Sequence, residues 1–175
     1  MPKFIATILE LALLVCALWV IFFLSAFLHE AGHALGYMIA TGDRHWHIRV
    51  GSGKKLLNTK KLTVKLLPFD GCFTSPENNK INTAAKLIAT LSGGPAVSLI
   101  LVAALLPVKI SGISLQSEVI TSEAMEFFFN SAFFVNLFIL ILSLIPTRYF
   151  YGEIKGMETD GLQILHAIKR RKNKP

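Results

Sequence analysis

Two histidines and a glutamate lie close together early in the chain, in the pattern His29-Glu30-x-x-His33. On a helix, side chains four positions apart share one face, so His29 and His33 can offer their imidazoles to one metal ion. Glu30 lies beside that pair, where its carboxylate can take a proton from a water molecule at the metal. The spacing therefore predicts a metal site with His29 and His33 as ligands and Glu30 as the catalytic residue.

The surroundings of this motif are apolar, unlike those of a soluble zinc enzyme. From Phe4 to Leu28 only Thr7, Glu10 and Ser25 interrupt the apolar run, and the apolar pattern continues to Ala40. Ionisable residues at membrane depth cost free energy, which favours a functional role for them. The alternative is a few polar residues at a helix end that bind no metal.

Composition points to one membrane domain over residues 1–175. The chain has 175 residues, 53% of them hydrophobic, and a net charge of +7. That hydrophobic share is too high for an ordinary soluble domain. The basic residues flank apolar segments, which fits cytoplasmic loops and anionic lipid headgroups in a bilayer better than nucleic acid. Cys16 and Cys72 do not form a disulfide framework.

The hydropathy pattern predicts a mainly α membrane protein with three transmembrane helices. The predicted spans cover residues 4–40, 84–107 and 127–146. A β-hairpin module over residues 43–80, with strands at 45–50 and 62–67, separates the first two spans. We expect Thr41-Gly42-Asp43 to end the first helix, Pro95 to kink the second and Pro146 to end the third. A polar loop is expected over 108–126, and 147–175 is read as a cytosolic loop followed by a short interfacial helix.

The distribution of basic residues predicts the orientation. Residues 43–80 hold eight of the 18 lysines and arginines, and residues 147–175 hold seven. By the positive-inside rule, the hairpin module and the C-terminal tail are cytoplasmic and the N-terminus is outside. The compact length and the lack of organelle signals favour the plasma membrane of a prokaryote.

The third metal ligand is not part of the histidine motif. Catalytic zinc usually takes three protein ligands and leaves a fourth position to water. The chain has only three aspartates. Asp43 follows the first helix too closely, Asp70 belongs to the hairpin, and Asp160 follows the third span with a glycine after it that permits close backbone approach. Asp160 is therefore the expected third ligand of one zinc ion, with Glu153 and Glu158 as alternatives.

Taken together, these motifs resemble the site-2 protease family of intramembrane zinc metalloproteases in its minimal three-helix form. The resemblance covers almost the whole chain, and the motifs come in the family's order. They are the His29–His33 motif, a membrane-reentrant hairpin from Gly51 to a Pro68-x-x-Gly71 turn, the small-residue segment Ser92-Gly93-Gly94-Pro95, and the series Asn136, Pro146, Asp160-Gly161. Ser143 stands where the family often has an asparagine, and the gap from Pro146 to Asp160 is longer than in the commonest pattern.

The resemblance implies a zinc-dependent endopeptidase that cleaves a single-pass membrane protein or a membrane peptide. Asn136, Gly71 and Pro95 are then the expected substrate-binding residues. The hairpin edge can hold the substrate extended as an added strand, or the hairpin can be a purely structural plug. Because the sequence shows no PDZ domain, we expect the choice of substrate to depend on the core itself or on a regulatory membrane partner. Two alternatives stay open: a non-catalytic membrane protein of the same fold that binds a partner or peptide, and an ion carrier.

Overall fold

The computed structural model describes residues 2–75, 80–111 and 122–172 of the chain. Within them the fold is mainly helical, with one antiparallel two-stranded sheet. In chain order the elements are α1 (Pro2–Thr41), β1 (His47–Asn58), β2 (Leu62–Thr74), α2 (Ala84–Ser111), α3 (Ser122–Leu144) and α4 (Asp160–Lys172). Three segments are long and apolar enough to cross a membrane: Lys3–Thr41, Ala84–Ile110 and Glu123–Leu144. The predicted element order is confirmed.

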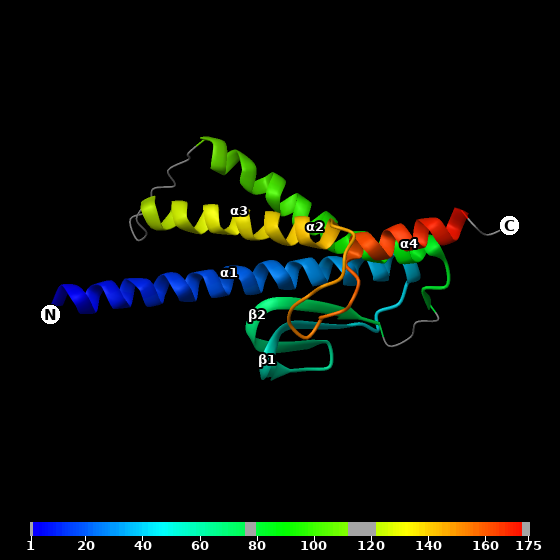
Figure 1. Ribbon diagram of the computed structural model, residues 1–175, viewed down its shortest axis with the longest axis horizontal. Coiled ribbons are helices and arrows are strands. Elements are labelled where there is room, and N and C mark those ends of the chain that lie inside the picture. Colours follow the sequence, from blue (N-terminus) through cyan, green and yellow to red (C-terminus); the bar gives the residue numbers. More distant parts are fainter. Residues whose placement is uncertain (1, 76–79, 112–121, 173–175) are drawn as a thin grey trace.

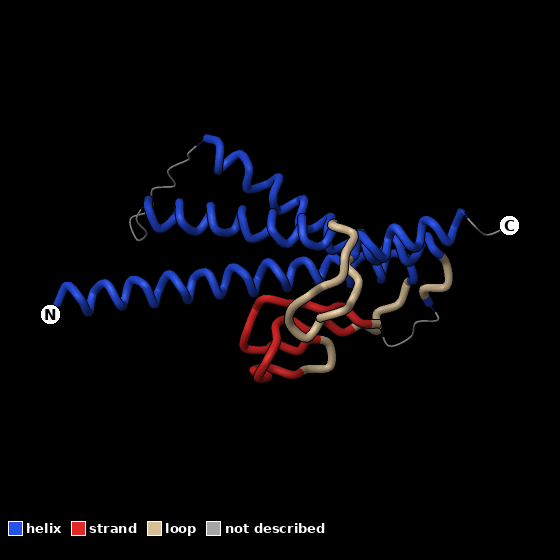
Figure 2. Tube along the Cα trace, viewed as in Figure 1, coloured by secondary structure: helices blue, strands red, loops and turns tan. Residues whose placement is uncertain are grey.

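Helix α1 is the central element of the fold, because it packs against α2, α3 and both strands. Figure 1 shows α2 and α3 on one side of α1 and the sheet on the other, with the two termini at opposite ends. The tan loop in Figure 2 runs from the end of α3 past α1 to the sheet and returns to α4. This path brings the start of α4 to the C-terminal half of α1.

Glycines set the end of α1 and its closest contact with α2. Gly42 has a φ of 70°, and its N–H donates to the Met38 carbonyl at 2.9 Å, as a glycine just past a helix end does. This confirms the predicted end of the first helix. A Cβ on Gly32 of α1 would meet the backbone carbonyl of Gly93 in α2. The helices can therefore approach closely only because both positions lack side chains.

The sheet is larger than the sequence predicts. The strands predicted at 45–50 and 62–67 are too short, because β1 runs from His47 to Asn58 and pairs with β2, which runs from Leu62 to Thr74. Gly51 and Gly53 have φ values of 87° and 81°, and the register between the strands shifts repeatedly around them. Glycines in the left-handed region allow β-bulges, so the strand can change register here and stay paired with β2.

Two other predicted boundaries need correction. Helix α2 continues past Pro107 to Ser111, because a proline lacks only its own N–H donor and need not end a helix. Helix α3 begins at Ser122, with Glu123 in its first turn, where the helix dipole favours a negative charge. The polar loop predicted over 108–126 is thus shorter, and its residues 112–121 lie outside the described residues. Helix α3 ends at Leu144, two residues before Pro146.

The loop between α3 and α4, residues 147–159, is tied to the sheet. Asp70 of β2 is 4% exposed and accepts hydrogen bonds from Arg49 Nη1 at 2.7 Å and from the Glu153 N–H at 3.0 Å. Gly152 lies against the same carboxylate with a φ of 66°, a position where a Cβ would come within 2.5 Å of Asp70 Oδ2. This docking leads the chain across α1 before α4 begins at Asp160.

Candidate metal centre

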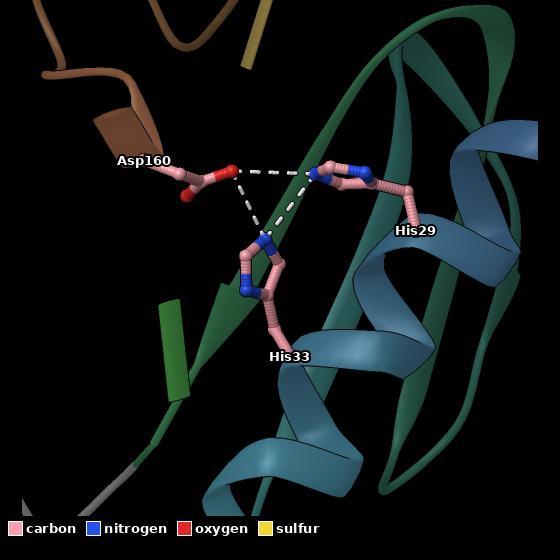
Figure 3. Close-up of side chains that lie close together, drawn as sticks. All are labelled: His29, His33 and Asp160. Carbon is pink, nitrogen blue, oxygen red and sulfur yellow. Dashed lines mark hydrogen bonds and ion pairs between the residues drawn. The ribbon is translucent and has the colours of Figure 1, made fainter. Parts of the chain in front are cut away.

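Three donor atoms from two distant parts of the chain meet beside α1. His29 and His33 lie one turn apart on α1, and Asp160 is the first residue of α4. Asp160 Oδ2 lies 3.4 Å from His29 Nε2 and 3.3 Å from His33 Nε2, and the two Nε2 atoms are 3.3 Å apart (Figure 3). All three residues are at most 9% exposed. The structure thus brings together the three residues that the sequence analysis selected as ligands.

The size of this triangle fits a small divalent metal ion. Zinc binds nitrogen and carboxylate oxygen at about 2.0–2.1 Å, and tetrahedral geometry then separates two donors by about 3.3 Å. The three observed separations are 3.3, 3.3 and 3.4 Å. Every edge of the triangle matches, so His29, His33 and Asp160 are residues that could hold such an ion.

Contacts to α2 orient both imidazoles. His33 Nδ1 lies 3.0 Å from the Thr90 carbonyl oxygen, and His29 Nδ1 lies 2.9 Å from Ser98 Oγ. A carbonyl only accepts, so His33 Nδ1 carries the proton in that bond. The Nε2 atom of a neutral His33 then has a free electron pair. Buried partners of this kind are typical of histidines that bind metal, because they set the tautomer and the ring orientation.

The chemistry of the converging atoms calls for a cation. Burial raises the pKa of the Asp160 carboxyl, but its contacts with His29 and His33 outweigh burial and lower the pKa to about 2. At neutral pH the Asp160 carboxylate is therefore ionised and faces the two imidazoles, so a positive charge is needed beside it, either a proton on an imidazole or a metal ion. A proton can bridge one pair of these atoms at a time, whereas a metal ion satisfies all three together.

The backbone of α2 closes one side of the triangle. A Cβ on Gly94 would lie 2.7 Å from His29 Nε2 and closer still to His33 Nε2. A glycine is thus needed at this position for the two nitrogens to stay where they are. Thr90, Gly94 and Ser98 follow one another at intervals of four residues and so share one face of α2. The sequence pattern singled out Gly94 within the small-residue segment, but Thr90 and Ser98 were missed, although their spacing within an apolar helix was a visible signal.

Glu30 lies beside the triangle, between two cavities. The apolar cavity, of about 70 Å³, is bounded by α1, α3, β2 and the 147–159 loop. The metal-site cavity, of about 440 Å³, also contains His33 and Asp160. His29, Glu30 and Gly71 line both. A Cβ on Gly71 would be 2.5 Å from Glu30 Oε1, so this glycine leaves room for the carboxylate. Gly71 therefore lies next to Glu30, and substrate binding by this residue stays a prediction.

The two alternative ligands are engaged elsewhere. Glu153 accepts hydrogen bonds from Lys65 Nζ at 2.5 Å and from the Gly53 N–H at 3.1 Å, and the bond from Lys65 lowers its pKa. Glu158 pairs with Arg148 and His166, at 3.1 and 3.2 Å. Neither belongs to the group of donors around His29 and His33. Asp160 remains the carboxylate that is placed to complete the triangle.

Asn136 and Pro95 lie away from the cavities just described. Asn136 is 3% exposed, and its Nδ2 donates to Ser25 Oγ of α1 at 3.0 Å and to the Ala132 carbonyl at 2.8 Å. It therefore links α3 to α1, while its Oδ1 has no partner among the described residues. Pro95 is buried inside α2. Substrate binding by these two residues stays a prediction.

Comparison with known proteins adds no family assignment. No protein-family model, no curated protein and no solved structure matches the chain.

Proposed function

We propose that this chain is a zinc-dependent endopeptidase that cleaves a transmembrane or membrane-associated peptide segment within or next to the bilayer. In this proposal it is a minimal protein of the site-2 protease type. The observation that carries the proposal is the triangle of His29, His33 and Asp160 donors, with edges of 3.3–3.4 Å, next to the buried carboxylate of Glu30. Two histidines, one carboxylate ligand and a neighbouring acid are the set that metal-assisted peptide hydrolysis uses.

The mechanism assigns a separate task to each residue. A zinc ion held by His29, His33 and Asp160 would polarise the scissile carbonyl and acidify a water molecule. Glu30 takes a proton from that water as general base and later returns it to the leaving amine. Ser98 and Thr90 hold the imidazoles in place, and Gly71 leaves space beside Glu30. The reaction consumes one water and yields a new carboxylate and a new ammonium group.

The surroundings support a substrate that comes from the membrane. The apolar cavity beside Glu30 is lined by Phe22 and Ala26 of α1 and by Phe138 and Leu142 of α3, both candidate membrane-spanning helices. Trp19 Nε1 of α1 donates to the Leu66 carbonyl of β2 at 2.8 Å, so the sheet extends along the apolar half of α1. An unwound substrate segment could pair with the sheet beside this cavity.

The proposed location is a prokaryotic plasma membrane, with the N-terminus outside and the C-terminus in the cytoplasm. The lysines and arginines of the first loop and the tail support this orientation. Helix α4 carries four basic residues in its last turn, where they can meet anionic headgroups. The metal centre then lies toward the cytoplasmic face.

The test uses purified protein in liposomes with synthetic segments of about 22 apolar residues, the length that spans a bilayer. The segments differ in central residues that weaken the helix, and mass spectrometry detects the products. We expect wild type to cleave some of them and Glu30→Gln to reduce the rate by about 10²–10⁴-fold, because the general base is lost. Metal content should stay near one ion per chain in Glu30→Gln and fall in His29→Ala and Asp160→Asn.

The outcomes separate the proposal from its rivals. Full activity of Glu30→Gln would refute the mechanism. Metal binding by wild type without cleavage of any segment would favour a non-catalytic protein that binds a partner or peptide. Metal or proton flux in the same liposomes would favour an ion carrier.

A further inference from the structure

Tyr149 lies where the two cavities meet. Like His29 and Glu30, it lines both the apolar cavity and the metal-site cavity. The side chain is half-buried. Its phenol therefore borders the space in which a substrate carbonyl would lie between the metal ligands and Glu30. The proposed mechanism gives this residue no task.

The loop holds the backbone of Tyr149 in a defined position. Its N–H donates to the Met157 carbonyl at 2.9 Å, and its carbonyl accepts from the Gly156 N–H at 2.7 Å. Arg148 and Glu158 bridge the two arms of the loop next to it. Docking of the loop on Asp70 fixes the far end. The loop therefore holds Tyr149 in position before a substrate binds, and electrostatic catalysis requires this kind of preorganisation.

The hydroxyl of Tyr149 is available as a donor. It has no hydrogen-bond partner within residues 2–75, 80–111 and 122–172. Burial, followed by the carboxylates of Asp160 and Glu30, raises the pKa of the phenol. The group therefore keeps its proton at neutral pH. Because Tyr149 also lines both cavities, the residue lies on the side of the loop that faces the metal ligands and Glu30.

Other polar donors around the cavities are already bonded. In each of these residues the hydroxyl, thiol or amide group donates to another protein atom. The residues are Cys72, Thr74, Ser75, Thr90, Ser143 and Gln163. Tyr151 differs from Tyr149, because it lines the apolar cavity alone and the charge that acts on its phenol is that of Asp70. Tyr149 is thus a side-chain donor that borders both cavities, next to Glu30, and has no hydrogen-bond partner among the described residues.

We infer that the Tyr149 hydroxyl stabilises the oxyanion of the peptide-bond hydrolysis, an inference that rests on the proposed function. When water attacks the carbonyl carbon, its proton passes to Glu30 and the π electron pair of the C=O bond moves to the oxygen. Tyr149 donates a hydrogen bond to that oxygen and keeps its own proton. As the carbonyl reforms, the C–N bond breaks and the amine takes the proton from Glu30.

The variant Tyr149→Phe tests this role, with Tyr151→Phe as the matched control on the same loop. The substrate is the synthetic segment that wild type cleaves fastest. Removal of one oxyanion donor lowers kcat by about 10²–10³-fold in enzymes where this has been measured. We expect a loss of that size in Tyr149→Phe, with KM and the metal content per chain unchanged. Tyr151→Phe should lose far less of kcat, because its phenol lines the apolar cavity alone and the charge that acts on it is that of Asp70.

Inhibitor binding provides a second readout that does not depend on turnover. A phosphinic peptide presents a tetrahedral oxyanion in place of the scissile amide, whereas a hydroxamate of the same sequence binds the metal without one. We expect Tyr149→Phe to weaken the phosphinic peptide about 100-fold, the size of one lost oxyanion contact, and to leave the hydroxamate unchanged. Equal weakening of both, unchanged kcat, or loss of metal from Tyr149→Phe would overturn the inference.

The two proposals fail in different ways. If wild type cleaves no segment and binds neither inhibitor, the proposed peptidase function is wrong and this role falls with it. If wild type cleaves, Glu30→Gln does not, and Tyr149→Phe equals wild type, only the role of Tyr149 is wrong.

Discussion

The substitution Gly94→Ala tests the metal centre without altering any ligand. A Cβ at this position would lie 2.7 Å from His29 Nε2 and closer to His33 Nε2, where ordinary contact begins at 3.4 Å. The first nitrogen must therefore move by at least 3.4 − 2.7 = 0.7 Å, and the second by more. Metal–ligand distances tolerate only about 0.2 Å. We expect the metal affinity to fall by at least about 100-fold, or roughly 2.7 kcal/mol.

The assay is metal content per chain by mass spectrometry, followed by competition with a chelator for the dissociation constant. Ala96→Gly is the matched control, because it changes one methyl group on an exposed face of the same helix turn. It should bind metal as wild type does, although glycine costs about 0.5–1 kcal/mol of helix stability. Wild-type affinity in Gly94→Ala would refute the assignment of the site, since the helix backbone fixes the direction of the new Cβ toward both Nε2 atoms.

Two further predictions concern the contacts around the site and at the end of α1. Ser98→Ala should weaken metal binding about 10–100-fold, because it removes the partner of His29 Nδ1. Ser92→Ala, on another face of α2, is the control and should bind metal as wild type does. Equal affinities of the two variants in a chelator competition would contradict this prediction. Hydrogen bonds from Tyr37 and then His45 lower the pKa of Asp43, so this carboxylate contributes stability that is present above its unfolded pKa of about 3.9 and is lost as the pH falls below it. Between pH 6 and pH 3 the thermal midpoint of wild type should therefore drop more than that of Asp43→Asn, and parallel drops in calorimetry would rule this out.

Local features of this protein follow from the sequence alone. The four-residue spacing places His29 and His33 on one face wherever the helix lies, because the helical period is a property of the backbone. The apolar runs predict the three long helices, because each run is long and apolar enough to cross a bilayer. Gly42 marks the end of α1 because few other residues adopt its φ of 70°.

Strand boundaries were less predictable. The glycine-rich stretch at 51–55 has the composition of a turn, yet pairing with β2 keeps it within a strand. Backbone pairing partners lie on another segment, so a local pattern does not reveal whether a glycine forms a turn or a bulge.

Only the tertiary structure decided which carboxylate meets the histidines. Asp160 lies 131 positions after His29, and Glu153 and Glu158 are nearly as far along the chain. The three carboxylates lie close together in the sequence, so their distance along the chain from the histidines does not show which of them binds the metal. The choice follows from the docking of the 147–159 loop on Asp70, which commits Glu153 to Lys65 and begins α4 at Asp160. The contacts of Ser98 and Gly94 with the histidines depend on the packing of α2 against α1, and the place of Tyr149 beside the cavities depends on the docked loop.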